Sequence, residues 1–260
     1  RVWDNHGRTS KWSEPAFWEI GLLGEEDWTA WWITPGMEEK EKDSRPAPYL
    51  RQEFDAAGEV VSARVYVTGL GLYELWLNGV RVSDPFTPGW TSYKKRIQVQ
   101  VYDVTPFIRQ GRNAAGAILG DGWYRGNIGW IGNRNYYGSE PLFRFQLEIL
   151  YRDGRTETVV SDSRWKSATG PILMSDIYNG ETYDARLERP GWTTPGYDAS
   201  GWTAVRVAQR VRVGRLELDL LRLVLRCGEE QVELSTAEFR LLEAMMERPN
   251  SVQSRDTLMT

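Results

Sequence analysis

The sequence predicts a mainly β fold, a sandwich or jelly roll, with a small α+β appendage at its C-terminal end. Three observations lead to this prediction. Apolar and polar residues alternate with a period of two through most of the chain, turn signals separate the alternating runs, and a helical period is absent before about residue 235. With 260 residues, the chain is long enough for one large or two smaller domains.

The chain begins with what is predicted to be the end of a β domain. Residues 1–23 contain a turn signal at Asn5–Gly7 and alternate between apolar and polar residues around Phe17–Ile20. This pattern resembles the closing strands of a fibronectin-III-like domain. A charged connector that contains prolines follows at Gly36–Pro48.

From Tyr49 onward, the period-two alternation predicts a series of strands. The runs YLRQEFDA, VVSARVYVTG and LYELWLNGVRV come first, and Asn78-Gly79 in the third is a two-residue hairpin signal. A second hairpin is predicted at FRFQLEILYRDGRTETVVSD, with its turn at Asp153-Gly154. Alternate apolar residues from Phe143 to Ile149 then lie on one face of the sheet.

A repeated tryptophan motif suggests the limits of the main domain. Trp28–Ala30 recurs as Trp202–Ala204, each after a polar turn, and we expect both tryptophans to fill the start of a strand. Two such plugs suit one closed sandwich, so the main domain is predicted to span residues 24–208. The chain has 13 tryptophans in all, which we interpret either as core anchors or as surfaces that stack on sugars.

Residues 209–260 are predicted to form the small appendage. The stretch from Val211 to Leu234 has the pattern of two or three short strands. A helix follows with Ser235 or Thr236 as its N-cap, and a second helix is predicted to start at Ser254. The apolar stripe of the first helix consists of Phe239, Leu241, Leu242, Met245 and Met246.

Composition excludes several classes of function. The formal net charge of -4 gives no basic field that would attract nucleic acid. With Cys227 as the only cysteine and His6 as the only histidine, the chain has no disulfide framework, histidine-based catalysis or Cys/His zinc site. No apolar run approaches about 18 residues, so no membrane span is expected. No signal peptide is visible, which favours a cytoplasmic over a secreted location, and the opening residues resemble a truncated terminus.

The stretch LGDGWYRGNIGWIG is the strongest candidate binding loop. Its glycines permit positive φ and a close approach of ligand to backbone. Trp123 and Trp130 can offer flat apolar faces to a pyranose, and Asp121, Arg125 and Asn127 can bridge vicinal hydroxyls. The alternative interpretation is a structural loop whose tryptophans close the edge of the sandwich.

Two further motifs supply candidates. Trp90 in TPGWTSY is either a second sugar-stacking surface or a core anchor. In NGETYDAR, Asn179 and Glu181 are candidate sugar ligands, and Asp184 and Arg186 are predicted to form a structural ion pair.

Loop oxygens also suggest a calcium site. Asp84, Asn133 and Asn135 are weak candidate ligands, because carboxylate and amide oxygens suit this ion. The dense Asp ladder of an EF-hand is absent from the sequence, so possible calcium binding is the only cofactor prediction.

Several separated motifs resemble the N-terminal region of bacterial α-L-rhamnosidases. They are LWLNGVRVSDPFTPGWTSY, YDVTPFIRQGRNAAGAILGDGWYRGNIGW and DIYNGETYDARLERPGW, and the resemblance covers about residues 1–208. It implies a galactose-binding-like jelly-roll sandwich that precedes an (α/α) barrel with the catalytic carboxylates. That barrel is absent here, so no catalytic residue and no turnover are expected of this chain. In related domains the sandwich binds terminal rhamnose, in some cases with calcium, which implies a rhamnose-containing glycan as partner.

The C-terminal residues resemble an unrelated family. LSTAEFRLL, followed by Ser254-Arg255, is similar to the first half of an OmpR/PhoB-type winged-helix effector domain over about residues 210–260. The recognition helix and wing of that family would lie beyond Thr260. From Gln209 onward the chain has eight arginines, no lysine and nine acids, so DNA binding by this segment is not expected.

Three functions are compatible with these observations. The first is a non-catalytic carbohydrate-recognition domain of an α-L-rhamnosidase-like glycoside hydrolase. The second is a structural linker domain without sugar binding. The third is a fragment of a transcriptional regulator with a DNA-binding C-terminus. The two resemblances indicate a chimeric chain, either a misassembled reading or an unusual natural fusion.

Overall fold

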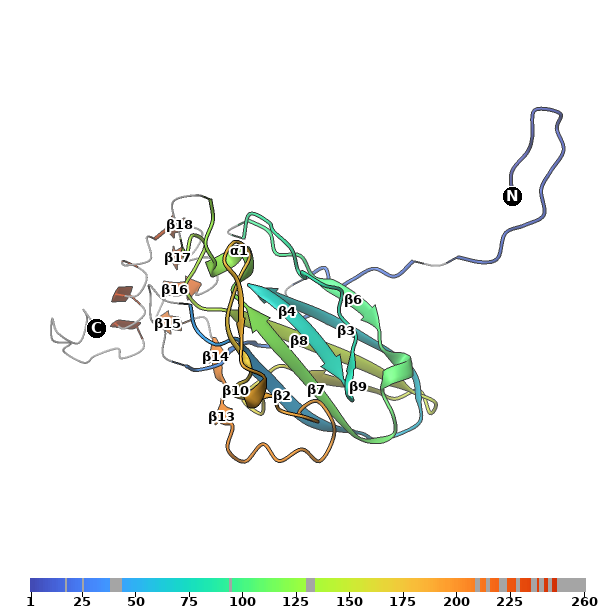
Figure 1. The fold of residues 1–260 in the computed structure, drawn as a ribbon. Helices are drawn as coiled ribbons and strands as arrows, with labels where there is room; N and C mark the ends of the chain where they lie inside the picture. The colour runs from blue at the N-terminus through green and yellow to red at the C-terminus, as the bar shows by residue number, and fades with distance from the viewer. Residues whose placement is uncertain are drawn as a thin grey trace.

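The computed structural model of the protein is mainly antiparallel β-structure. Two sheets enclose the largest hydrophobic core, which takes side chains from both (Figure 1). The mainly β sandwich predicted from the sequence is therefore confirmed. The structure describes residues 1–16, 18–24, 26–37, 44–93, 95–129, 134–208, 211–213, 216–219, 224–227, 230–234, 238, 241–242 and 245–246.

Each large sheet has six strands. The first has the order β14 (Arg206–Ala208), β1 (Trp32–Thr34), β8 (Leu142–Tyr151), β3 (Val60–Leu70) and β6 (Gln100–Asp103), with β9 (Thr156–Val160) also paired to β8. The second has the order β13 (Thr203–Ala204), β10 (Lys166–Thr169), β2 (Pro48–Ala56), β7 (Gly111–Gly120), β4 (Leu72–Leu77) and β5 (Val80–Arg81). Short 3-10 turns occur at η1 (Thr105–Phe107) and η2 (Ala185–Leu187).

The predicted alternation in β8 is confirmed. Phe143, Phe145 and Leu147 are completely buried, and Ile149 is 1% exposed, so one face of this strand points into the core. Trp165 is also completely buried, and its ring meets those of Phe143 and Phe145 edge-on at centroid distances of 5.7 and 5.4 Å. This aromatic group forms part of the core between the two sheets.

Both predicted hairpin turns are present. Asn78 and Gly79 have positive φ of 48° and 87° and join β4 to β5, which is the combination that a type I′ turn requires. Gly154 has φ of 83° in the turn between β8 and β9.

The two tryptophans of the repeated motif differ in burial. Trp202 is buried just before β13. Trp28 is half-buried, and the guanidinium of Arg144 lies over its ring, 4.3 Å from the centroid.

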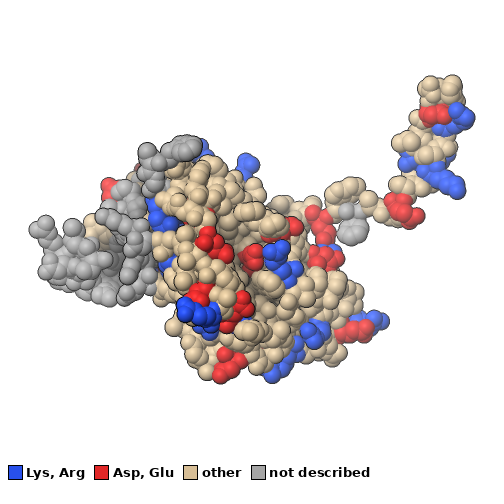
Figure 2. All heavy atoms as spheres, viewed as in Figure 1, with Lys and Arg blue, Asp and Glu red and all other residues tan. Residues whose placement is uncertain are grey.

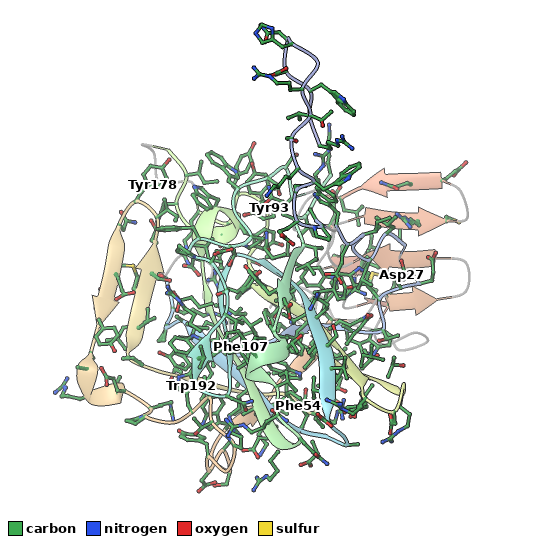
Figure 3. All side chains as sticks on the ribbon, turned by 90° about the vertical axis from the view of Figure 1, so that its right-hand side faces the viewer. Asp27, Phe54, Tyr93, Phe107, Tyr178 and Trp192 are labelled. Atoms are coloured by element: carbon green, nitrogen blue, oxygen red, sulfur yellow. The ribbon has the colours of Figure 1, made fainter. Side chains whose placement is uncertain are left out.

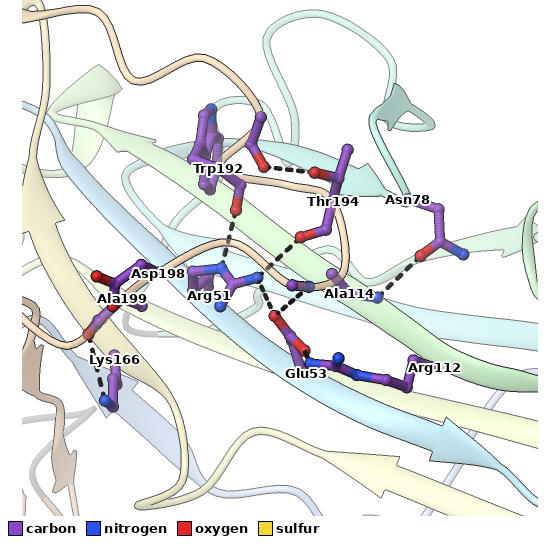
Figure 4. A network of polar contacts seen from close by, with 12 residues as sticks. Arg51, Glu53, Asn78, Arg112, Ala114, Lys166, Trp192, Thr194, Asp198 and Ala199 are labelled. Atoms are coloured by element: carbon purple, nitrogen blue, oxygen red, sulfur yellow. Dashed lines mark hydrogen bonds and ion pairs between the residues drawn. The ribbon is translucent and has the colours of Figure 1, made fainter.

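A strap formed by residues 189–202 is bonded to the second sheet. Arg51 on β2 is buried, and its guanidinium donates to the Trp192 and Thr194 carbonyls at 2.8 and 3.0 Å (Figure 4). Glu53 compensates this charge, with an oxygen 2.8 Å from Arg51, and a second ion pair joins Glu53 to Arg112. A buried guanidinium that bonds two backbone carbonyls and a carboxylate holds the strap in one position.

Replacing Gly116 with alanine is expected to destabilise the protein by about 1–3 kcal/mol. An added Cβ would lie 2.5 Å from a ring carbon of Trp192, so the strap and β7 cannot keep their present contact. The free energy of unfolding from urea titration measures the effect. Gly201→Ala is the control, because a Cβ there meets no atom within 4 Å. Equal losses for the two variants would show that the strap does not pack on Gly116.

The chain begins with a segment that extends away from the sandwich, over residues 1–16 (Figure 1). An isolated bridge joins Trp3 to Thr9 around the predicted turn, where Gly7 has φ of 75°. Trp18 is 87% exposed, and the described residues 18–20 pair with no strand in the part of the chain that the structure describes. Glu19 joins this segment to β3 through an ion pair with Arg64 at 2.6 Å.

The C-terminal segment forms a separate small sheet. Four antiparallel strands pair in sequence order, where two or three were predicted: β15 (Val211–Val213), β16 (Leu216–Asp219), β17 (Val224–Cys227) and β18 (Glu230–Glu233). In the predicted first helix, the described residues have helical backbone: Glu238, Leu241, Leu242, Met245 and Met246. The predicted caps, Phe239 and the second helix lie outside the described residues.

On the face shown in Figure 2, acidic and basic side chains are interspersed, with no large patch of one sign. Within the described ranges, no helix is long and apolar enough to cross a membrane.

Candidate functional site

The glycine-rich loop follows β7 and contains the short helix α1 (Gly122–Arg125). Gly122 has φ of 53°, and a Cβ there would lie 2.7 Å from the Leu72 side chain, so glycine is needed for both conformation and space. Trp130 and Asn133, predicted as sugar and calcium ligands, lie outside the described residues.

Asp121 and Arg125 contact each other. The sequence predicts that they bridge sugar hydroxyls, but Asp121 Oδ1 lies 3.2 Å from Arg125 Nε, and Asp121 Oδ2 lies 2.6 Å from Arg134 Nη2. Ser44 donates a further hydrogen bond to Asp121 Oδ2 at 3.1 Å. The exposed fractions of the Asp121, Arg125 and Arg134 side chains are 8%, 1% and 9%.

This buried ion cluster gives both residues contacts within the chain, and their predicted role as sugar ligands stays a prediction. A guanidinium that is removed from water needs a carboxylate beside it, and Asp121 provides one to Arg125 and to Arg134. Sequence reasoning missed Arg134, which lies 13 residues from Asp121 and shares no local motif with it. The ion pairs of Asp121 with Arg125 and Arg134 join the loop to the residues that follow it.

Two predicted tryptophans from separate motifs meet at the surface. The rings of Trp90 and Trp123 stack with centroids 6.2 Å apart and planes within 5°. Trp90 is 51% exposed, and its indole Nε1 donates to the Tyr137 hydroxyl at 3.2 Å. Tyr136, which is also exposed, contacts the Tyr137 ring. We call Trp90, Trp123, Tyr136 and Tyr137 the aromatic shelf.

Buried aromatic rings support the shelf from below. Tyr93 packs against Tyr137 with ring centroids 5.0 Å apart and against Tyr124 at 5.2 Å. Trp123 and Tyr137 lie partly buried against a small hydrophobic cluster that contains Tyr93 and Tyr124. Burial raises the pKa of the Tyr93 hydroxyl, so this group stays neutral at physiological pH. The shelf is thus built on a base of packed aromatic and aliphatic side chains.

Asn127 and the NGETYDAR motif are linked by a residue that sequence reasoning missed. Asp176 ends β11 (Ile172–Asp176), which forms a hairpin with β12 (Gly180–Tyr183); Tyr178 lies in the turn between them (Figure 3). The Asp176 carboxylate bonds Asn127 and also the backbone of the turn residues. The sequence signal for Asp176 concerns only its bonds to the turn. An aspartate placed three residues before an Asn-Gly turn commonly accepts hydrogen bonds from the backbone of that turn.

The charge state of Asp176 follows from these bonds. Burial acts to raise the pKa of its carboxyl, but backbone N–H groups of Asn127, Asn179 and Tyr178 favour the charged form, and the net effect is a pKa below the ordinary value. Asn179 and Glu181, the predicted sugar ligands of this motif, are both exposed. The predicted pair of Asp184 and Arg186 is confirmed, at 2.6 Å.

Of the candidate calcium ligands, Asp84 and Asn135 lie among the described residues. Asp84 is exposed, and its backbone N–H donates to the Tyr102 hydroxyl. Asn135 has φ of 60°, and its backbone N–H donates to the Arg125 carbonyl. Among the residues that the structure describes, no group of three or more histidines, cysteines or acids is placed to hold a metal ion. Calcium binding stays a prediction.

The fold and these contacts define an antiparallel β-sandwich domain with an exposed aromatic surface. Residues 58–219 match the family described as the alpha-L-rhamnosidase N-terminal domain, and residues 1–24 match a Rha78A-like N-terminal immunoglobulin domain. The chain belongs to the alpha-L-rhamnosidase N-terminal domain family. The first match includes β15 and β16, which the sequence assigned to the appendage. The winged-helix resemblance of residues 210–260 gains no support from these matches and stays a prediction.

Curated relatives agree with this family. An alpha-L-rhamnosidase of Streptomyces avermitilis is 45% identical over 206 residues, which cover 78% of this chain and 20% of the relative. One of Formosa agariphila is 40% identical over 219 residues, covering 79% of this chain and 23% of the relative. The chain thus spans about a fifth of the length of the curated relatives it matches.

Solved structures of the same kind share the fold. Native α-L-rhamnosidase from Aspergillus terreus superposes with a TM-score of 0.72 at 42% identity, over 74% of this chain and 22% of that one. The Streptomyces avermitilis enzyme, solved in complex with L-rhamnose, gives a TM-score of 0.62 at 48% identity, over 64% of this chain and 16% of that one.

Proposed function

We propose that this chain is a non-catalytic carbohydrate-recognition domain of an α-L-rhamnosidase-like glycoside hydrolase and that it binds a rhamnose-containing glycan. The observation that carries the proposal is the stacked Trp90–Trp123 pair, because one indole is half exposed while the other is anchored in a packed cluster. Rigid aromatic rings of this kind offer a flat apolar face with little loss of conformational entropy on binding.

We assign further polar groups to the proposed site. The Tyr137 hydroxyl accepts from Trp90 Nε1, so its own proton is available to a ligand oxygen. Asn127, Asn179 and Glu181 add amide and carboxylate groups from the loop and the hairpin. Asp121 and Arg125 act indirectly, by holding the loop through the buried ion cluster. Hydrolysis is assigned to the part of the parent protein beyond this chain.

Replacing Trp90 with alanine is expected to weaken binding of L-rhamnose about tenfold, equivalent to about 1.4 kcal/mol. The variant removes the exposed ring of the stack and leaves the buried cluster in place. Isothermal titration calorimetry measures the affinity. Trp18→Ala is the matched control, because Trp18 is 87% exposed and lies in the N-terminal segment outside the sandwich. Unchanged affinity in Trp90→Ala would remove the shelf from the binding site.

A specific observation favours a second candidate function, that of a structural linker domain. The carboxylate of Asp121 is satisfied within the domain, and the β11–β12 region exposes the apolar side chains of Tyr178, Tyr183 and Leu187, which suit contact with another domain. The same calorimetric titration separates the two candidates. Saturable binding of L-rhamnose to the unmodified chain supports recognition, and the absence of binding up to millimolar sugar supports the linker.

A further inference from the structure

We propose that Asp176 is a positioning residue that determines which hydrogen-bonding group of Asn127 the α1 loop presents to a ligand. The inference rests on the proposed function, because the ligand is the saccharide bound there. It makes Asn127 a hydrogen-bond acceptor for a sugar hydroxyl, and it makes the β11–β12 hairpin part of the site.

The contacts of Asp176 divide between its two carboxylate oxygens. Oδ2 accepts from the backbone N–H of Asn127 at 2.8 Å and from its side-chain Nδ2 at 2.9 Å. Oδ1 accepts from the backbone N–H groups of Tyr178 and Asn179 at 2.9 and 3.0 Å. One side chain therefore bonds the α1 loop and the hairpin turn at the same time.

The chemistry of the two side chains fixes the orientation of the Asn127 amide. An ionised carboxylate only accepts hydrogen bonds, whereas an amide has an accepting and a donating end. Asn127 must therefore turn Nδ2 toward Asp176, and its Oδ1 points to the opposite side. Because Asn127 is only half-buried, Oδ1 is available as an acceptor for a hydroxyl proton.

Local packing permits this close contact. A Cβ on Gly126 would lie 3.1 Å from Asp176 Oδ2, so a larger residue would crowd the carboxylate at the point where it meets the loop. Asp176 is itself buried, so its bonds are little weakened by competing water. The loop and the exposed turn residue Asn179 are consequently held as one unit.

The test compares the unmodified chain with Asp176→Asn. An asparagine that keeps its oxygen on the turn N–H groups points an NH₂ at Asn127, so the Asn127 amide reverses and presents its donor outward. Calorimetry with L-rhamnose and its mono-O-methyl ethers detects this reversal. A sugar hydroxyl can donate a hydrogen bond to Asn127 Oδ1, whereas the ether oxygen that replaces it can only accept one. We expect the unmodified chain to bind at least one ether about tenfold more weakly than L-rhamnose, and Asp176→Asn to lose this discrimination.

Two further variants separate positioning from folding. Asp184→Asn is the matched control. The Asp184 carboxylate also accepts from a backbone N–H two residues on, at 3.1 Å, but the groups that donate to it in the described part of the chain all belong to Arg186. It should bind like the unmodified chain. Asn127→Ala keeps Asp176 and its bonds to the hairpin turn, and it should lose the discrimination even if Asp176→Asn fails to fold.

Amide hydrogen exchange provides the readout that does not depend on sugar. The Asn127 backbone N–H should exchange at least tenfold faster in Asp176→Asn than in Asp184→Asn. An unchanged exchange rate of the Asn127 N–H would overturn the link that Asp176 makes between the α1 loop and the hairpin. If Asp176→Asn or Asn127→Ala still binds the methyl ether more weakly than L-rhamnose, the positioning role is overturned. If the unmodified chain binds no L-rhamnose, the proposed function fails, and the role of Asp176 in positioning Asn127 for a sugar fails with it. The exchange rate of the Asn127 N–H still decides whether Asp176 links the α1 loop to the hairpin.

Discussion

Trp165→Ala is expected to destabilise the sandwich by about 3–5 kcal/mol, a large fraction of the stability of an ordinary domain. Trp165 is completely buried, and its ring lies edge-on against Phe143 and Phe145. Its indole Nε1 donates to the Val160 carbonyl at 3.0 Å, so alanine leaves both a large cavity and an acceptor without its donor.

Urea unfolding followed by far-ultraviolet circular dichroism measures this loss without relying on tryptophan fluorescence, which the substitution itself changes. Trp18→Ala provides the control and should lie within about 0.5 kcal/mol of the unmodified protein, because its side chain is 87% exposed. A loss below about 1 kcal/mol for Trp165→Ala would be incompatible with a packed core at this position.

Asp121→Ala is expected to cost a similar amount, about 3–5 kcal/mol, for an electrostatic reason. The substitution removes the carboxylate that faces both Arg125 and Arg134, whose side chains are 1% and 9% exposed. Two buried guanidinium groups would then be left without this negative partner. The same unfolding measurement applies.

Asp153→Ala is the matched comparison for Asp121→Ala. Asp153 pairs with Arg155 at 2.8 Å, but both side chains are more than half exposed, so water screens the pair and the loss should be much smaller than for Asp121→Ala. Equal losses in the free energy of unfolding at the two positions would mean that the buried Asp121 carboxylate stabilises the protein no more than an exposed ion pair does. If Asp121→Ala also lowers sugar affinity, the stability measurement assigns that effect to support of the loop.

The predicted strands and turns agree with the structure because they depend on neighbouring residues. The alternation from Phe143 to Ile149 identified the buried face of β8, and Asn78-Gly79 identified a turn that needs positive φ at both positions. The same local reasoning identified Trp90 and Trp123 as candidates. That their rings stack is a property of packing, because 33 positions separate them along the chain.

The roles of the predicted site residues depend on contacts that the sequence does not show. Asp121, Arg125 and Asn127 have the residue types that bind sugars, but the same groups also satisfy each other inside proteins. Which of these happens depends on burial and on partners such as Arg134 and Asp176, which lie 13 and 49 positions from the residues they contact. Sequence periodicity contains no information about such distant pairs.

Alternation and turn chemistry along the chain were thus sufficient for the fold class and the hairpins, because each depends on residues that are close together in the sequence. The rhamnosidase family entered through the resemblance of whole motifs. The tertiary structure decided which side chains became internal supports and which formed a surface. The buried Asp121 cluster, the Trp90–Trp123 stack and the Asp176 link each arise where two distant segments exclude water together, and the free energy of such contacts depends on that exclusion.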